Sequence, residues 1–295
     1  MERRSITEGL NKKTRNIDIV PTIKVVEMIN NEDKIVAKAV GKEKKKIAKA
    51  IDLIAESFLN DGRLLYFGAG TSGRLGVLDA SECPPTFGVN ETMVQGFIAG
   101  GDEALRKAIE GAEDSEELGT QDFIKSNASK NDVVAVISAS GNANYVVSVL
   151  KNAKNNRIKT VAVCCNKNAK IKHYADIFIC PVVKEEVISG STRMKAGTAQ
   201  KMVLNMLTTG SMIKIGKTYH NYMIDLKATN DKLKQRAINI VSEIANVKKD
   251  IAQKTLEENN YNVKLSVVML SMSTDTETAK KLLKDNNGVL RNIKE

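Results

Sequence analysis

The chain is poor in residues on which many enzyme mechanisms and nucleic-acid surfaces depend. Its 295 residues include no tryptophan, only two histidines (His173 and His220) and 4% aromatic residues. With two histidines, a Ser/Cys–His triad or a His-rich metal site is poorly supported. With few aromatic rings, stacking platforms for single-stranded nucleic acid are scarce. These absences point away from histidine-based hydrolysis and from nucleic-acid binding.

Cysteine is also rare, and its spacing is uninformative for metal binding. The four residues lie beside or inside apolar segments and lack the paired spacing of zinc ligands: Cys83, Cys164, Cys165 and Cys180. We therefore expect buried, reduced thiols and no metal site.

Long apolar runs are missing as well. No stretch reaches the roughly 20 apolar residues that a membrane helix needs. The first eight residues contain two arginines with no apolar run behind them, unlike a secretory signal. The hydrophobic fraction of 42% and the charged fraction of 27% are typical of soluble globular proteins. We expect a soluble, cytoplasmic protein with no membrane partner.

The net charge of +10 has two interpretations. Lysines fall mostly on helical segments, such as residues 42–46, and elsewhere alternate with acids. A solvated basic surface therefore explains the charge better than a nucleic-acid partner does. A mild attraction for small anionic substrates is a secondary inference.

Short apolar runs without alternation indicate the fold. They cover residues 64–67, 133–137, 160–164 and 176–179, with residues 93–99 as a further candidate. Such runs suit strands that are covered on both faces. Helical stretches, such as residues 145–155, lie between several of them. This order predicts an α/β fold with a doubly wound, mostly parallel sheet flanked by helices.

Helical patterns bracket this region. Residues 23–29 and 45–59 carry apolar side chains at helical spacing, and residues 199–215 form a long apolar segment suited to the core or to a dimer interface. The sequence after His220 is polar with a helical pattern, and this pattern is interrupted near residues 259–260 and 286–288. We expect three parts: an N-terminal helical segment (1–55), a central domain built on the sheet (56–219) and a small helical domain (220–295).

A glycine-rich loop follows the first predicted strand. Gly68, Gly70 and Gly73 have the G-x-G-x-x-G spacing of a dinucleotide site, but the next strand candidate does not end in the acidic residue that would hold a ribose. Thr71 and Ser72 instead supply hydroxyl donors at a helix start, where backbone N–H groups and the helix dipole favour an anion. With the charge of Arg74, the loop predicts a phosphomonoester site rather than a nicotinamide cofactor.

Two further loops repeat this chemistry. One follows the strand at 133–137, and the other opens the apolar helix. Their candidate ligands are Ser138, Ser140 and Asn142 in the first, and Ser191, Thr192 and Lys195 in the second. Each alone is often a helix cap. Together the three loops predict a cradle for a sugar phosphate.

Long motifs identify a family. The run from Gly68 to Thr86 closely resembles N-acetylmuramic acid 6-phosphate etherases of bacteria, members of the sugar isomerase (SIS) domain superfamily. The similarity covers nearly the whole chain. Further matching segments, in the family's order, are Ile6–Gly9, Glu110–Asp114, Gly190–Lys201 and Ala228–Asn230. One segment departs from the pattern, because Asn142-Ala143-Asn144 stands where a stretch like Arg-Thr-Pro is expected.

The resemblance implies cleavage of the D-lactyl ether of N-acetylmuramic acid 6-phosphate, yielding N-acetylglucosamine 6-phosphate and D-lactate, with no cofactor. The family's two catalytic glutamates correspond to Glu82 and Glu113. On the family analogy we assign Glu82 as the acid that helps lactate leave and Glu113 as the base at C2, although the residues themselves do not order the two roles. The neighbouring Cys83 suggests partial burial of Glu82, and Pro84-Pro85 is expected to end its helix. SIS domains commonly complete their sites across a subunit interface, which implies a homodimer.

Two alternatives remain open. An amino-sugar-phosphate isomerase of the same fold would also use a base at C2, but only an etherase releases lactate. A non-catalytic SIS protein would bind a sugar phosphate without turning it over. The presence of both glutamates argues against such a sensor.

Overall fold

The computed structural model describes residues 8–294, which form two units. The first comprises residues 8–81 and 92–210, and the second comprises residues 82–91 and 211–294. The three-part division expected from the sequence (1–55, 56–219 and 220–295) uses different boundaries and stays a prediction. Ile6 and Thr7 of the first family-like motif lie outside the described residues.

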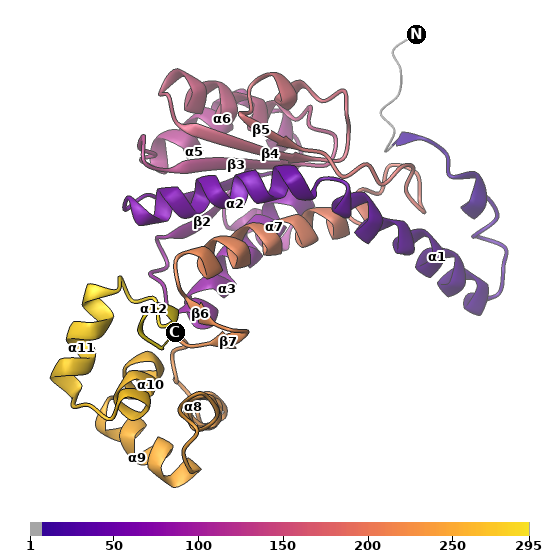
Figure 1. Cartoon of the computed structure of the whole chain (residues 1–295). Helices are drawn as coiled ribbons and strands as arrows, with labels where there is room; N and C mark the ends of the chain where they lie inside the picture. Colours follow the sequence, from indigo (N-terminus) through magenta and orange to yellow (C-terminus); the bar gives the residue numbers. More distant parts are fainter. Residues whose placement is uncertain (1–7, 295) are drawn as a thin grey trace. The chain divides into compact units, whose positions relative to one another are not determined.

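The first unit is built on a parallel five-stranded sheet with the order β2-β1-β3-β4-β5 (Figure 1). Each strand overlaps one of the apolar runs, and β1 and β3 are buried throughout. The predicted doubly wound sheet is confirmed. The strands are β1 (Leu64–Gly68), β2 (Val94–Ile98), β3 (Val133–Ser138), β4 (Lys159–Cys164) and β5 (Ile177–Ile179).

One face of this sheet is covered by α5 (Glu116–Lys125) and α6 (Asn144–Asn155) (Figure 1). Tyr145 and Leu150 of α6 are fully buried there in one cluster with Phe67 of β1. The apolar stripe of α6 follows the helical spacing seen in the sequence, so burial of this stripe holds the helix on the sheet.

The opposite face carries α2 (Lys44–Leu59), α3 (Gly70–Phe87) and α7 (Lys195–Lys214) (Figure 1). Glycines let α3 lie unusually close to the strands. A Cβ on Gly73 would come within 2.7 Å of the Gly68 carbonyl oxygen, and one on Gly96 of β2 within 2.7 Å of the Val77 Cα. The start of α3 is therefore fixed against the end of β1.

The chain before the sheet is helical, as predicted. After the short turn η2 (Lys12–Thr14), α1 runs over Thr22–Gly41 and leads into α2. The pattern recognised at 23–29 is only the beginning of α1, because the polar residues at 30–34 interrupt the apolar spacing without ending the helix. Ile23 and Val26 of α1 remain exposed in the single chain.

Three short elements connect the strands of the first unit. They are α4 (Glu103–Arg106), η3 (Ala112–Asp114) and η4 (Lys170–His173). None is evident in the apolar periodicity, because each has four residues or fewer.

The second unit is mainly helical, as expected, with a core that includes Val241, Leu256 and Val267. The helices break at the two expected asparagine-rich places and also at Asn246 and Ser273, which have φ values of 53° and 49°. A small antiparallel hairpin before the helices was not predicted. The elements are β6 (Thr218–Tyr219), β7 (Tyr222–Met223), α8 (Asp231–Ala245), α9 (Lys249–Glu258), α10 (Val263–Met272), α11 (Thr276–Asp285) and α12 (Arg291–Lys294).

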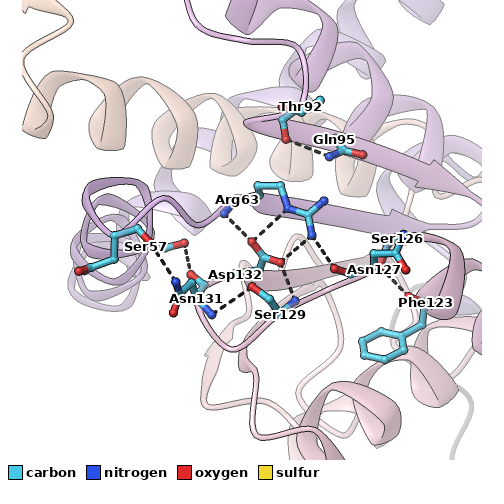
Figure 2. Close-up of polar contacts among 11 residues, drawn as sticks. Ser57, Arg63, Thr92, Gln95, Phe123, Ser126, Asn127, Ser129, Asn131 and Asp132 are labelled. Atoms are coloured by element: carbon cyan, nitrogen blue, oxygen red, sulfur yellow. Dashed lines mark hydrogen bonds and ion pairs between the residues drawn. The ribbon is translucent and has the colours of Figure 1, made fainter.

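An ion pair joins the amino ends of β1 and β3 (Figure 2). The Arg63 Nη2 atom lies 2.7 Å from Asp132 Oδ2, and the backbone N–H groups of Arg63 and Ser129 each donate to this carboxylate at 2.7 Å. Burial alone would raise the pKa of Asp132, but these hydrogen bonds and the charge of Arg63 outweigh it and lower the pKa below its ordinary value. This network fastens two strands to each other.

A cavity of about 440 Å³ lies beside the ion pair. It is larger than the cavity at the carboxyl edge described below. In open α/β sheets, however, ligands bind outside the carboxyl ends of the strands, so cavity size alone does not mark the functional edge here.

The four cysteines are buried and form no disulfide, as expected from their neighbours. Within residues 8–294, no helix is both long enough and apolar enough to cross a bilayer. The same residues contain no cluster of three or more His, Cys, Asp or Glu side chains suited to a metal ion.

Candidate functional site

Two of the three hydroxyl-rich loops lie at the carboxyl edge of the sheet. The register pairs Gly68 of β1 with Ile98 of β2 and with Ile137 of β3. The loop after β1 and the loop after β3 therefore leave the sheet side by side. This is the crevice in which open parallel sheets bind ligands.

The first loop leads directly into α3. Gly70 has φ +52°, a left-handed conformation that glycine adopts without strain. In the part of the chain that the structure describes, the Thr71 hydroxyl makes no hydrogen bond. The Ser72 hydroxyl, in contrast, donates to Oε1 of the buried Gln200 at 3.0 Å. The Thr71 hydroxyl and the backbone N–H groups of Thr71 and Ser72 are therefore available to an anion. The Gly73 N–H, in contrast, donates to the Ala69 carbonyl oxygen at 3.3 Å, and the Ser72 hydroxyl proton is already used.

The guanidinium group of Arg74 donates hydrogen bonds to another segment of the protein rather than to the glycine-rich loop. Its Nε donates to the Leu105 carbonyl oxygen at 3.1 Å, and its Nη2 donates to the Lys107 carbonyl oxygen at 2.8 Å. Both acceptors lie at the end of α4, where helix carbonyl groups lack intrahelical partners. The guanidinium thus holds the segment that leads to Glu113.

The second loop keeps two hydroxyl protons available. Ser138 Oγ accepts the Gly141 N–H at 3.0 Å, and Ser140 Oγ accepts the Asn142 N–H at 3.3 Å. Since each oxygen serves as an acceptor, each O–H can donate to a ligand. Gly141 has φ 68°, which the tight turn after β3 requires.

The segment that departs from the family pattern has contacts of its own. Asn142 Oδ1 accepts the Lys170 N–H at 3.0 Å and so ties the second loop to the segment after β4. Asn144 Nδ2 donates to the Asp114 carbonyl oxygen at 3.1 Å, next to Glu113. The asparagines thus connect loops rather than leaving the turn loose.

In the third segment, two candidate residues have available hydroxyl groups and one is already paired within the protein. Ser191 and Thr192 are partly exposed, and their hydroxyls make no hydrogen bond among residues 8–294. Lys195 is fully buried, and its Nζ lies 2.6 Å from Glu32 Oε2 of α1. Burial of Glu32 would raise its pKa, but hydrogen bonds from Lys195 and Asn11 outweigh this and lower the pKa.

The amino end of α7 already has an anionic partner. The carboxylate of the fully buried Glu186 accepts the backbone N–H groups of Lys195 and Ala196, each at 2.9 Å. Burial raises the pKa of Glu186, and the two N–H bonds oppose this only in part. These two amides of α7 are therefore not available to a ligand.

A cavity of about 260 Å³ separates the start of α3 from the segment that carries Glu113. Glu113 is exposed in η3, after Gly111 turns the chain with φ 72° and Ala112 anchors it in the core. The cavity brings three predicted residues together: Gly70, Arg74 and Glu113. Its full lining is Ala69, Gly70, Arg74, Ala99, Ala104, Lys107, Ala108, Ile109, Glu110, Gly111, Ala112 and Glu113.

Glu82 belongs to the second unit and is exposed, so the partial burial expected from Cys83 is wrong. Cys83 is buried, but consecutive residues of an α-helix point about 100° apart, so burial of one does not bury the next. The helix also does not end at the prolines. It continues to Phe87, and the Pro84 carbonyl accepts the Gly88 N–H at 2.9 Å, since a proline loses its donor but keeps its acceptor.

Free hydroxyls and helix-start amides along the carboxyl edge of a parallel sheet are consistent with the expected SIS fold and with an anionic ligand. Profiles of known domains agree. Residues 46–154 match the glucokinase regulatory protein N-terminal SIS domain, and residues 111–210 match the SIS domain. Residues 220–284 match the C-terminal lid domain of glucokinase regulatory protein.

Full-length relatives narrow the class. The chain is 54% identical over 291 residues, 98% of its length and 96% of the relative's, to an N-acetylmuramic acid 6-phosphate etherase of Clostridium botulinum (strain Hall). It is 54% identical to one of Vibrio atlanticus, covering 97% of this chain and 94% of that one. The chain belongs to the N-acetylmuramic acid 6-phosphate etherase family.

Solved structures support the fold. A proposed phosphosugar isomerase involved in capsule formation from Bacteroides fragilis superposes with a TM-score of 0.50 at 19% identity, covering 66% of this chain and 91% of that chain. At this identity the similarity concerns the sheet and its helices, not the chemistry.

Sequence reasoning missed Gln200 and Glu110. Gln200 is almost completely buried beside Ser72, and its Nε2 has no hydrogen-bond partner in the described chain. Glu110 lines the same cavity as Glu113. Both stand in the family-like motifs, but only a contact or a cavity wall distinguishes them from their neighbours.

Proposed function

We propose that the protein cleaves the D-lactyl ether of N-acetylmuramic acid 6-phosphate and releases N-acetylglucosamine 6-phosphate and D-lactate. The observation that carries this proposal is 54% identity to a named etherase over 98% of the chain. The cavity that places Glu113 beside the phosphate-type loop of α3 is consistent with it. No cofactor is part of the proposal.

The chemistry follows from the position of the ether. In the ring-opened sugar, C3 is β to the aldehyde carbon, and the carbonyl acidifies the C2 proton. A base removes that proton, the C2–C3 double bond forms, and the C3–O bond breaks as an acid protonates the departing lactate oxygen. Water then adds across the double bond. Two carboxyl groups in opposite protonation states can perform these transfers.

In this proposal Glu113 is the base and Glu82 is the acid. Glu113 is supported by its exposed position in the wall of the cavity. Glu82 is supported by the family-like motif Ser81–Pro84.

The phosphate is bound by the first turn of α3 and by free hydroxyls. Gly70 permits close approach of the backbone, and the hydroxyls with protons to donate are those of Thr71, Ser138, Ser140, Ser191 and Thr192. Ser72 and Asn142 shape these loops through Gln200 and Lys170. Arg74 and Lys195 are not assigned to the phosphate, because each already contacts other groups of the protein.

Isotope exchange separates the two glutamates. In D2O, Glu113→Gln should lose deuterium incorporation at C2 together with lactate release, by roughly 10²- to 10⁴-fold. Glu82→Gln should lose lactate release while C2 exchange continues. Glu116→Gln, in the same acidic run, is the matched control. It should behave like the parent, because Glu116 is exposed and its ion pair with Lys151, at 3.6 Å, is a weak surface contact. Full C2 exchange in Glu113→Gln would disprove the base assignment.

Product analysis distinguishes the rival functions. An isomerase would convert an amino-sugar phosphate into a ketose without lactate. A sensor would bind N-acetylmuramic acid 6-phosphate without turnover. Lactate formed by the purified protein supports the etherase function. A ketose product without lactate would favour the isomerase, and binding without turnover would favour the sensor.

We also propose a homodimer. An apolar groove of about 510 Å³ runs between α2 and α7, with Ile47, Ile51, Met202 and Met206 among its lining residues. Met206 is 41% exposed in the single chain. A second copy would cover this surface, so Met206→Asp should shift the mass measured by light scattering from two chains to one. A monomeric parent at all concentrations would contradict the dimer.

A cytoplasmic location belongs to the same proposal. Four buried thiols that form no disulfide suit a reducing compartment. The scarcity of aromatic residues supports the absence of a nucleic-acid partner. Filter binding to single-stranded DNA at 0.15 M salt should therefore give no retention.

A further inference from the structure

The segment that carries Glu113 is held at its beginning by Arg74. The two carbonyl oxygens that Arg74 engages, at 3.1 and 2.8 Å, belong to Leu105 and Lys107. Leu105 is in α4, and Lys107 directly follows the last residue of this helix. Burial holds α4 only weakly, since Ala104 is its one buried residue.

The same segment is held at its far end by Asn144. The amide Nδ2 of Asn144 donates to the Asp114 carbonyl oxygen at 3.1 Å. Between the two contacts the chain turns at Gly111, buries Ala112 and exposes Glu113. Arg74 lies on α3 and Asn144 begins α6, so the segment is attached to two helices that start at the carboxyl edge.

We propose that Arg74 and Asn144 are positioning residues for Glu113, and that Arg74 acts on this carboxylate's segment rather than on the substrate phosphate. The inference rests on the proposed role of Glu113 as the base at C2. Proton transfer requires the base within hydrogen-bond distance of the proton. A displacement of about 1 Å by a distant substitution lowers a rate by roughly 10²-fold.

A phosphate ligand and a positioning residue give different kinetics. Arg74→Ala should lower kcat and C2 deuterium exchange by roughly 10- to 100-fold, while inhibition by inorganic phosphate changes less than about two-fold. Arg74→Lys should recover part of kcat, since an ammonium group can still donate to one carbonyl. A large loss of phosphate inhibition with kcat retained would make Arg74 a phosphate ligand and overturn the proposal.

Asn144→Asp tests the second contact without weakening α6. An acidic side chain is favourable in the first turn of a helix, but a carboxylate cannot donate to the Asp114 carbonyl. We expect the same loss of kcat with unchanged phosphate inhibition. Parent-like exchange in this variant would remove Asn144 from the proposal. Arg106→Ala, an exposed arginine on α4, is the matched control and should keep parental rates.

A double-variant cycle separates positioning from general damage to the fold. If Arg74 acts through Glu113, adding Arg74→Ala to Glu113→Gln should cause no further loss of C2 exchange. A further 10-fold loss would show that Arg74 acts independently of Glu113. If Glu113→Gln alone exchanged C2 at the parental rate, the proposed function of Glu113 would fail first, and the two failures would be distinguished.

Discussion

Lys195 offers the sharpest test of structure against sequence. The sequence predicts a substrate contact for this lysine, but its Nζ is buried 2.6 Å from Glu32 Oε2. We therefore expect Lys195→Met to destabilise the protein rather than to weaken substrate binding selectively. The pair joins α1 to the start of α7, so its loss should also free α1.

The magnitude follows from what remains around Glu32. Breaking a buried ion pair costs about 3–5 kcal/mol, because one charge stays buried without its partner. After the substitution Glu32 keeps the Asn11 amide at 2.8 Å and the largely exposed Lys13 at 3.3 Å. These partners place the loss at the lower end, about 3 kcal/mol, which is roughly a 10²-fold change in the folding equilibrium.

Urea unfolding followed by circular dichroism measures this loss, since the chain has no tryptophan for fluorescence. Lys38→Met, an exposed lysine of α1, is the control and should stay within about 0.5 kcal/mol of the parent. The double variant Glu32→Gln/Lys195→Met should recover much of the loss, because no buried charge remains. Parental stability with a raised KM in Lys195→Met would refute the structural account and restore the lysine as a ligand.

Two further predictions concern the sheet. Gly73→Ala should lower stability by about 1–3 kcal/mol and raise KM, because its Cβ would lie 2.6 Å from Ile98 Cγ1; a melting curve and substrate titration measure both. Asp132→Asn should cost about 2–3 kcal/mol at pH 7 by weakening the contact with Arg63. Because folding lowers the pKa of Asp132 from 3.8, its contribution is present above that pH and is lost as pH falls through the folded-state pKa. Urea unfolding at pH 7 and in acid should therefore show the gap between parent and variant closing, and a gap constant with pH would contradict this.

The fold could be predicted from the sequence because its strands are buried on both faces. Uninterrupted apolar runs such as residues 133–137 identify them without tertiary information. The hairpin of β6 and β7 was missed because each strand has only two residues. The breaks at Asn246 and Ser273 were missed because neither glycine nor proline marks these left-handed residues.

The candidate site was predictable only in part. Motifs indicated which loops carry hydroxyl and amide donors suited to a phosphate. The sequence could not show that Ser72 donates to Gln200 or that Lys195 pairs with Glu32. These partners lie 128 and 163 residues away in the chain. Whether a hydroxyl or a cation is free for a ligand depends on such long-range contacts, which one sequence does not reveal.

The side chain of Glu186 limits which helix can bind the proposed phosphate. Helices α3 and α7 both direct amides outward from their first turns, and each alone would attract an anion. The protein occupies two amides of α7 with its own carboxylate and leaves the glycine-rich start of α3 open. If the phosphate binds as we propose, these two amides of α7 cannot contact it, and the amides at the start of α3, beside the cavity of Glu113, remain available.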